Sequence, residues 1–161
     1  MRKLPYLLSA LGAALTAMVC ALTVGKKKYA DVQELAIESQ KKGNELKAQF
    51  VDVIDRDTEA FNAVSAVFAM PKDTDEEKAA RKAAMQEALK GCTKTPFEMM
   101  ELACQALELT RSVVGKLNAS AASDLGCAAL SLKAAIQGAW LNVLINIGGI
   151  QDQAFADEYR Q

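Results

Sequence analysis

The strongest constraint on the fold is an uncharged stretch from Leu4 to Val24, which lies between Arg2 and Lys3 on one side and Lys26–Lys28 on the other. An apolar run of this length is typical of a membrane span or a signal peptide, and also of a helix in a protein core. Small side chains recur at every fourth position of the run, a spacing that lets helices pack closely in lipid or in protein: Ser9, Ala13, Ala17 and Ala21. The run therefore predicts a closely packed helix and leaves its surroundings open.

The composition of the whole chain favours helices. Of its 161 residues, 51% are hydrophobic, and only nine are glycine and three are proline. So few turn-forming residues leave little material for the many tight turns of an all-β fold. We expect a single all-α domain, an antiparallel helical bundle that spans residues 1–161.

Charge and missing residue types exclude several classes of function. A formal net charge of −1, together with the lack of a recognisable binding motif, argues against nucleic-acid binding. The chain has no histidine, which excludes Ser–His and Cys–His nucleophile pairs and the common histidine metal sites. Cys20, Cys92, Cys104 and Cys127 form no C-x-x-C pair, so we expect them to fill the core of a reduced, cytoplasmic protein without a metal site.

Local signals place four further helices, over residues 31–69, 74–90, 95–117 and 123–147. Gly43 is a possible interruption of the first of these. Thr74 and Glu77 have the spacing of a capping box, which opens the second. Gly91 marks its end, and Pro96 marks the start of the third. The last helix is so strongly apolar that we expect it to be buried nearly all round.

One acidic residue falls on the apolar face of helix 31–69. Residues three or four apart make up this face: Phe50, Ile54, Asp57, Phe61, Val64 and Phe68. A carboxylate turned toward a core is costly unless it is paired or protonated, and such a group is suited to giving and taking a proton. Asp57 is therefore the candidate general acid and base, and the alternative reading is a hydrogen-bonded structural residue.

Four other residues are weaker candidates for binding a ligand. Asn142 and Asn146 lie one turn apart in the last apolar helix, where they would either hydrogen-bond a flat heteroaromatic molecule or join helices. Asp124 lies near the start of that helix, and Lys27 lies in the lysine run. Capping and solvation are the commoner roles for residues in such positions. We take all four as candidate substrate-binding residues.

Five segments resemble one known family, in matching order along almost the whole chain. They read ALGAALTAMVCALTVGKKKYADV, DRDTEAFNAV, MPKDTDEEKAARKAAMQEAL, NASAASDLGCAAL and GAWLNVLINIGGIQDQAF. They are similar to the cyclodeaminase domain of formiminotransferase-cyclodeaminase and to its standalone bacterial relatives, the methenyltetrahydrofolate cyclohydrolases. The first segment is a core helix in that family, so the resemblance favours a buried helix over a membrane span.

The resemblance implies an all-helical homodimer that acts on the one-carbon unit of tetrahydrofolate, with no other cofactor. The first reaction that it implies is closure of 5-formimidoyltetrahydrofolate to 5,10-methenyltetrahydrofolate with loss of ammonia. The alternative is hydrolysis of the methenyl form to 10-formyltetrahydrofolate. The catalytic acidic residue of the family lies in the D-x-D-x-E-A-F segment, at the position of Asp57.

Both ends of the chain depart from the family pattern. Relatives usually have a Pro-Gly-Gly-Gly-Ser loop before the first helix, where this chain reads MRKLPYLLSALG, and a further helix after the IQDQAF segment. Glycines in such a loop let backbone approach a ligand closely. We expect a domain that lacks this loop and this helix, with weakened substrate binding. The alternative from another functional class is an inactive helical interaction protein, which is either truncated or anchored in a membrane by residues 4–24.

Overall fold

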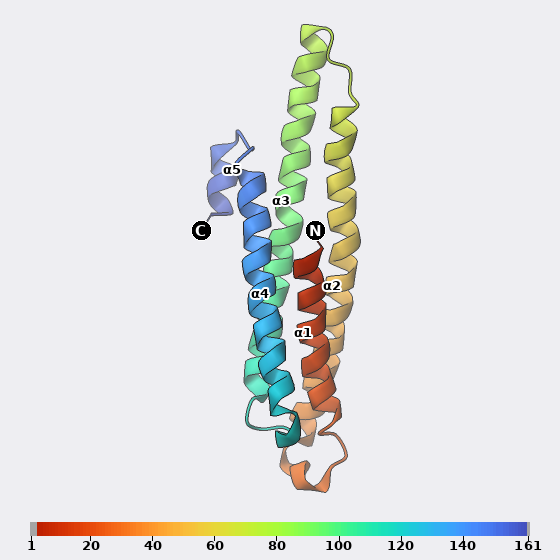
Figure 1. The fold of residues 1–161 in the computed structure, drawn as a ribbon, viewed down its shortest axis with the longest axis vertical. Coiled ribbons are helices and arrows are strands. Elements are labelled where there is room, and N and C mark those ends of the chain that lie inside the picture. The colour runs from red at the N-terminus through yellow and green to blue at the C-terminus, as the bar shows by residue number, and fades with distance from the viewer. Residues whose placement is uncertain (1–2, 161) are drawn as a thin grey trace.

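Four long helices lie side by side in the computed structural model, which describes residues 3–160 (Figure 1). They are joined in an up-and-down order by short turns, two of them 3₁₀ turns: α1 (Leu4–Ala21), α2 (Gln33–Phe68), α3 (Asp75–Val113) and α4 (Ala122–Ile147). A short fifth helix, α5 (Gln153–Glu158), packs against α3 and α4. The described residues contain no strand, so the predicted all-α antiparallel bundle is confirmed.

The helices differ in length, and this gives the bundle a step. α2 has 36 residues and α3 has 39, whereas α1 has 18. α1 begins beside the middle of α2, so the α2–α3 hairpin continues well beyond it (Figure 1). Four helices therefore surround the core at one end of the molecule, and fewer surround it at the hairpin end.

α1 packs with its small residues inward. Ser9, Ala13 and Ala17 are buried, whereas Leu7 and Leu11 are 57% and 49% exposed. Gly12 shows how close the packing is, because a Cβ atom added there would lie 2.6 Å from Cγ of Leu132 on α4. The predicted small-residue stripe thus forms the contact surface, and the bulkier stripe faces outward.

The two long central helices run through points where sequence signals predict breaks. Gly43 does not interrupt α2; a Cβ atom there would lie 3.0 Å from that of Ala17, so this glycine allows α1 to approach. The predicted break at Gly91 is wrong, because α3 continues through Gly91 and Pro96 to Val113. The predicted capping box of Thr74 and Glu77 is present at the start of α3.

The prediction that all four cysteines fill the core is half right. Cys20 and Cys92 are buried, but Cys104 and Cys127 are exposed. Burial raises the pKa of the Cys20 thiol to about 11, so it stays protonated and unreactive at neutral pH. The exposed pair lie on outer helix surfaces because α3 and α4 each turn only one face toward the core.

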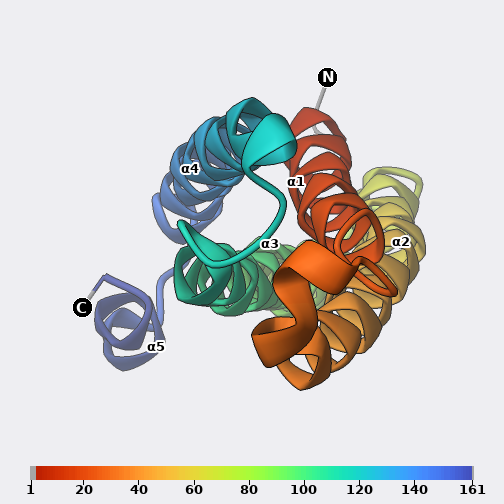
Figure 2. The same cartoon turned by 90° about the horizontal axis from the view of Figure 1, so that it is seen from below.

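The prediction that α4 is buried nearly all round is also wrong. Its inner face is buried at positions such as Leu132, Ala139 and Val143, but Leu130 and Ile145 are each 70% exposed. α1 and α4 are neighbours on one side of the bundle (Figure 2). By length and composition alone, Leu4–Ala21 and Ala119–Ile147 would each be able to cross a membrane.

Candidate active site

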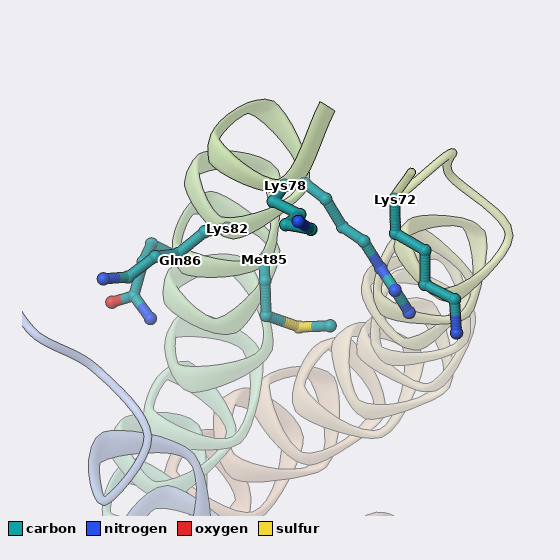
Figure 3. Close-up of a pocket in the computed structure, with 6 residues that line it drawn as sticks. Lys72, Lys78, Lys82, Met85 and Gln86 are labelled. Atoms are coloured by element: carbon teal, nitrogen blue, oxygen red, sulfur yellow. The ribbon is translucent and has the colours of Figure 1, made fainter. Parts of the chain in front are cut away.

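A cavity of about 420 Å³ lies near the tip of the α2–α3 hairpin (Figure 3). Its lining residues are Lys72, Lys78, Arg81, Lys82, Met85 and Gln86. Two of these cations make contacts within the hairpin. Arg81 donates hydrogen bonds to the backbone oxygens of Val67 and Phe68 at the end of α2. Lys78 forms an ion pair of 3.0 Å with Asp75. The lining includes no carboxylate, so this cavity does not hold the acidic residue that the sequence predicts as general acid and base.

Asp57 lies on the inner face of α2, as predicted. The buried positions of α2 that lead to it are spaced four and three residues apart: Leu46, Phe50, Val53 and Asp57. Asp57 is 9% exposed. Tyr6 of α1 is fully buried, and its hydroxyl donates a hydrogen bond of 2.9 Å to Oδ1 of Asp57. The carboxylate is therefore held against the end of α1, in surroundings that are largely apolar.

The second carboxylate oxygen of Asp57 is not engaged in the same way. Oδ2 has no hydrogen-bond or ion-pair partner among residues 3–160. Among these residues, every side-chain nitrogen or oxygen that is shielded from solvent has a hydrogen-bond partner. Because Oδ2 of Asp57 has none, it is exposed to solvent. Asp57 thus presents one fixed oxygen to the core and one open oxygen to the outside.

The predicted apolar face is correct as far as Asp57 and wrong beyond it. Phe61 and Phe68 were expected to be buried, but they are 47% and 64% exposed. The reason is the step in the bundle: α1 starts at Leu4, beside Asp57, and no longer covers α2 beyond that level. Asp57 is the last buried member of this face before the surface opens.

Arg56 follows Asp55 and precedes Asp57, but its guanidinium turns to another side of α2. It donates two hydrogen bonds of 2.7 Å each to Glu98 of α3 and one of 2.9 Å to Asp52. The hydrogen bonds with Glu98 raise the pKa of Arg56 above its usual range, so this side chain stays charged. Arg56 therefore ties α2 to α3 rather than neutralising Asp57.

The two asparagine candidates lie toward the same end of the bundle as Asp57. Asn146 is buried, and its side-chain nitrogen donates to the backbone oxygen of Cys92 at 2.6 Å. Pro96 has no N–H with which to satisfy that oxygen, so Asn146 replaces a missing helical hydrogen bond. Asn142 is half-buried one turn earlier. The structural reading of the asparagines therefore applies to Asn146.

Lys27 and Asp124 lie at the other end of the molecule. Lys27 starts the exposed turn between α1 and α2, and Asp124 is in the first turn of α4. The part of α2 between Gln33 and Asp57 alone spans roughly 36 Å at 1.5 Å per residue. In a single chain, these two residues are therefore out of reach of Asp57.

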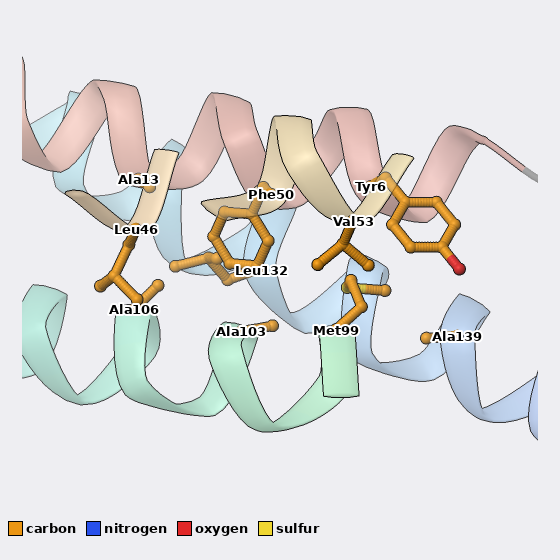
Figure 4. Packing of buried hydrophobic residues seen from close by; sticks show 10 residues of the cluster. All are labelled: Tyr6, Ala13, Leu46, Phe50, Val53, Met99, Ala103, Ala106, Leu132 and Ala139. Atoms are coloured by element: carbon orange, nitrogen blue, oxygen red, sulfur yellow. The ribbon is translucent and has the colours of Figure 1, made fainter. Parts of the chain in front are cut away.

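No motif or spacing in the sequence points to Tyr6 as a site residue. Its one local signal is that it is an aromatic hydroxyl within the uncharged run, two residues into α1. Its partner is 51 residues away, so the pairing depends on how α1 docks against α2. The ring packs among the residues of the central core, and the hydroxyl points away from them (Figure 4).

Comparisons with known proteins agree on one family. Residues 7–161 match a family model described as formiminotransferase-cyclodeaminase. A methenyltetrahydrofolate cyclohydrolase from Methylorubrum extorquens is 44% identical over 149 residues, which is 92% of this chain and 72% of that protein. A formimidoyltransferase-cyclodeaminase from Sus scrofa is 31% identical over 95% of this chain, which spans only 28% of that protein.

A solved structure has the same fold. Formiminotetrahydrofolate cyclodeaminase from Thermotoga maritima superposes with a TM-score of 0.84 at 26% sequence identity. The superposition covers 98% of this chain and 75% of the other. The likeness therefore extends over the whole bundle.

Proposed function

Since this chain belongs to the formiminotransferase-cyclodeaminase family, we propose that it is an enzyme of folate one-carbon metabolism that uses Asp57 for proton transfer. The observation that carries the proposal is the buried carboxylate with one oxygen fixed by Tyr6 and the other open to solvent. The proposed reactions need no cofactor besides the folate that carries the one-carbon unit. We also propose that the protein acts in the cytoplasm.

Of the two reactions, we propose hydrolysis of 5,10-methenyltetrahydrofolate to 10-formyltetrahydrofolate as the first. The relative that supports it is 44% identical and matches this chain over 72% of its own length. Ring closure with loss of ammonia, the first reaction implied by the sequence resemblance, becomes the second candidate, and the fold similarity to a cyclodeaminase supports it.

In hydrolysis, Oδ2 of Asp57 takes a proton from a water molecule as its oxygen attacks the methenyl carbon. The bond from that carbon to N5 then breaks while the new hydroxyl group loses its remaining proton and becomes the carbonyl oxygen, and N5 takes up a proton. The products are the 10-formyl group and a free N5. A positioned carboxylate suits the first step because it removes the proton while the new bond forms.

Ring closure would use the same carboxylate in a different order. Asp57 would accept the proton of N10 while N10 attacks the formimidoyl carbon. The protonated carboxyl group would then give a proton to the departing nitrogen, which leaves as ammonia. Asp57 thus serves either reaction. The two reactions differ in the group that leaves the reacting carbon, which is N5 in hydrolysis and ammonia in ring closure.

We propose that the substrate lies on the surface beyond the first turn of α1. Phe61 is one turn past Asp57 on the same face of α2, and its partly exposed ring offers an apolar surface for a flat heterocycle. Asn142 is a candidate hydrogen-bond partner at this end of the bundle. Lys27 and Asp124 lie too far from Asp57 of the same chain to contact a substrate bound there. They remain candidates only for substrate contacts elsewhere.

We further propose a homodimer, formed through the outer faces of α1 and α4. The outer face of α4 is exposed along its length, with Lys133 at its margin and uncharged residues at Cys127, Leu130, Ala134, Gln137, Leu141 and Ile145. The neighbouring face of α1 adds Leu7 and Leu11. A continuous apolar surface of this kind on a soluble protein is covered by a partner, and an identical copy offers the same surface in return.

The proposed function is tested by giving the purified chain each folate substrate and following the methenyl chromophore. We expect Asp57→Asn to lower turnover by roughly two to four orders of magnitude, because the amide no longer accepts the proton. Asp55→Asn is the matched control, since Asp55 is an exposed carboxylate two residues earlier on α2.

The outcomes separate the alternatives. Loss of the chromophore from the methenyl substrate identifies the hydrolase, and a gain of chromophore from the formimidoyl substrate, with release of ammonia, identifies the cyclodeaminase. Undiminished turnover by the Asp57→Asn protein would remove the proposed role of this residue. Inactivity of the wild-type chain toward both substrates would favour the non-catalytic reading.

A further inference from the structure

Tyr6 is held in place by packing on several sides. Its ring belongs to the same buried cluster as Phe50, Val53 and Met99 (Figure 4). Two further contacts fix the first turns of α1: Pro5 packs against Gly138 of α4, and the hydroxyl of Ser9 donates to the sulfur of Met99 at 3.1 Å. The hydroxyl of Tyr6 is therefore positioned by the core and does not depend on Asp57 for its location.

A phenol hydroxyl that is fully buried needs a hydrogen-bond partner, because leaving it without one costs free energy. Oδ1 of Asp57 accepts that hydrogen bond at 2.9 Å. A hydrogen bond to an ionised acceptor is stronger than one between neutral groups. The pair thus joins a rigid donor on α1 to a carboxylate on α2 that would otherwise be able to rotate.

We infer that Tyr6 is a positioning residue for Asp57. By holding Oδ1, it fixes the plane of the carboxylate and directs Oδ2 toward the surface where the substrate would lie. A rotating carboxylate would offer Oδ2 in the required direction only part of the time, and fixed geometry is what makes proton transfer efficient. This inference rests on the proposed function of Asp57 and deepens it.

The alternative is that the hydrogen bond only stabilises the fold. The two roles differ in what the loss of the hydroxyl does. A structural bond would lower stability and leave the chemical step unchanged, whereas a positioning bond would lower kcat and act only through Asp57. A double-mutant cycle with Asp57 separates the two.

The test compares Tyr6→Phe with the wild-type protein, in the wild-type background and in the Asp57→Asn background. We expect Tyr6→Phe alone to lower kcat roughly 10- to 100-fold, the range for losing a hydrogen bond to a charged group, with little change in KM. In the Asp57→Asn background, we expect it to have no further effect on kcat.

Tyr29→Phe is the matched control. The hydroxyl of Tyr29 accepts a hydrogen bond of 3.0 Å from the backbone N–H of Ala119, at the end of the bundle away from Asp57. Tyr29→Phe also removes a tyrosine hydroxyl that takes part in a hydrogen bond, and we expect this variant to keep the wild-type kcat.

A second measurement does not need turnover. In protein with ¹³C-labelled aspartate, Tyr6→Phe should move the side-chain carboxyl resonance of Asp57, and Tyr29→Phe should not. An unmoved resonance would overturn the inference, as would a wild-type kcat for Tyr6→Phe or an equal loss of kcat in both backgrounds. If Asp57→Asn abolishes turnover while Tyr6→Phe does not, the proposed function stands and the role of Tyr6 falls; an inactive wild-type chain overturns both.

Discussion

Individual residues show how far local patterns carry a functional prediction. Asp57 was found from spacing alone, because one charged residue on a helical apolar face is visible in any sequence. Tyr6 was missed because its role depends on a partner 51 residues away. Asn146 stands out in the sequence as an amide in an apolar helix, but its acceptor is a backbone oxygen four residues before a proline on another helix. Neither contact has a local signal.

The role of Asn146 gives a prediction about stability. We expect Asn146→Ala to lower the free energy of unfolding by about 1–3 kcal/mol, because it removes the buried hydrogen bond from Asn146 to the backbone oxygen of Cys92. In a Pro96→Ala background the cost should be smaller, since position 96 then has a backbone N–H for that oxygen. Urea denaturation of the four proteins measures both costs, and equal costs would contradict the assignment.

At the scale of helices, the sequence predicts where elements exist better than where they end. The capping box at Thr74 is local, and it was predicted correctly. Gly91 and Pro96 are also local signals for a break, yet α3 continues through them because its neighbours supply packing and a substitute hydrogen bond. The inward face of α1 is set in the same way, by how closely α4 approaches rather than by side-chain hydrophobicity.

Two glycine substitutions test this picture of helix packing. We expect Gly12→Ala to destabilise the protein by about 1–3 kcal/mol, because the new methyl group would force α1 away from Leu132. Gly91→Ala is the control: it meets no atom within 4 Å and lies inside a helix, so it should stabilise by about 0.5–1 kcal/mol. Thermal or urea unfolding gives both values, and destabilisation by both variants would count against close α1–α4 packing.

At the scale of the whole molecule, the sequence predicts the fold class and family but not which surfaces are left uncovered. The apolar content of α1 and α4 indicates burial, whereas each of these helices keeps an exposed outer face. A single chain holds no information in its local pattern about whether a partner or the core covers an apolar face. That is why the predicted burial of α4 failed while the expected bundle was correct.

The proposed dimer predicts a change in assembly. We expect Leu141→Glu to give a folded monomer, because it places a charge among the exposed apolar residues of the outer face of α4. Ile37→Glu is the control, since Ile37 is 53% exposed on α2, outside that face. Sedimentation of both proteins distinguishes the cases. A wild-type monomer, or a dimer that survives Leu141→Glu, would refute this interface.

The step beside Asp57 also divides the molecule mechanically. Below it, the close packing of the inner face of α1 against α2 and α4 holds the carboxylate in a fixed position. Above it, the outer half of the α2–α3 hairpin has fewer neighbours, so it opens and bends at lower cost. A substrate bound at this boundary, as proposed, would contact a fixed carboxylate on one side and a more easily deformed pair of helices on the other. Such an arrangement would admit and release a bulky molecule without displacing Asp57.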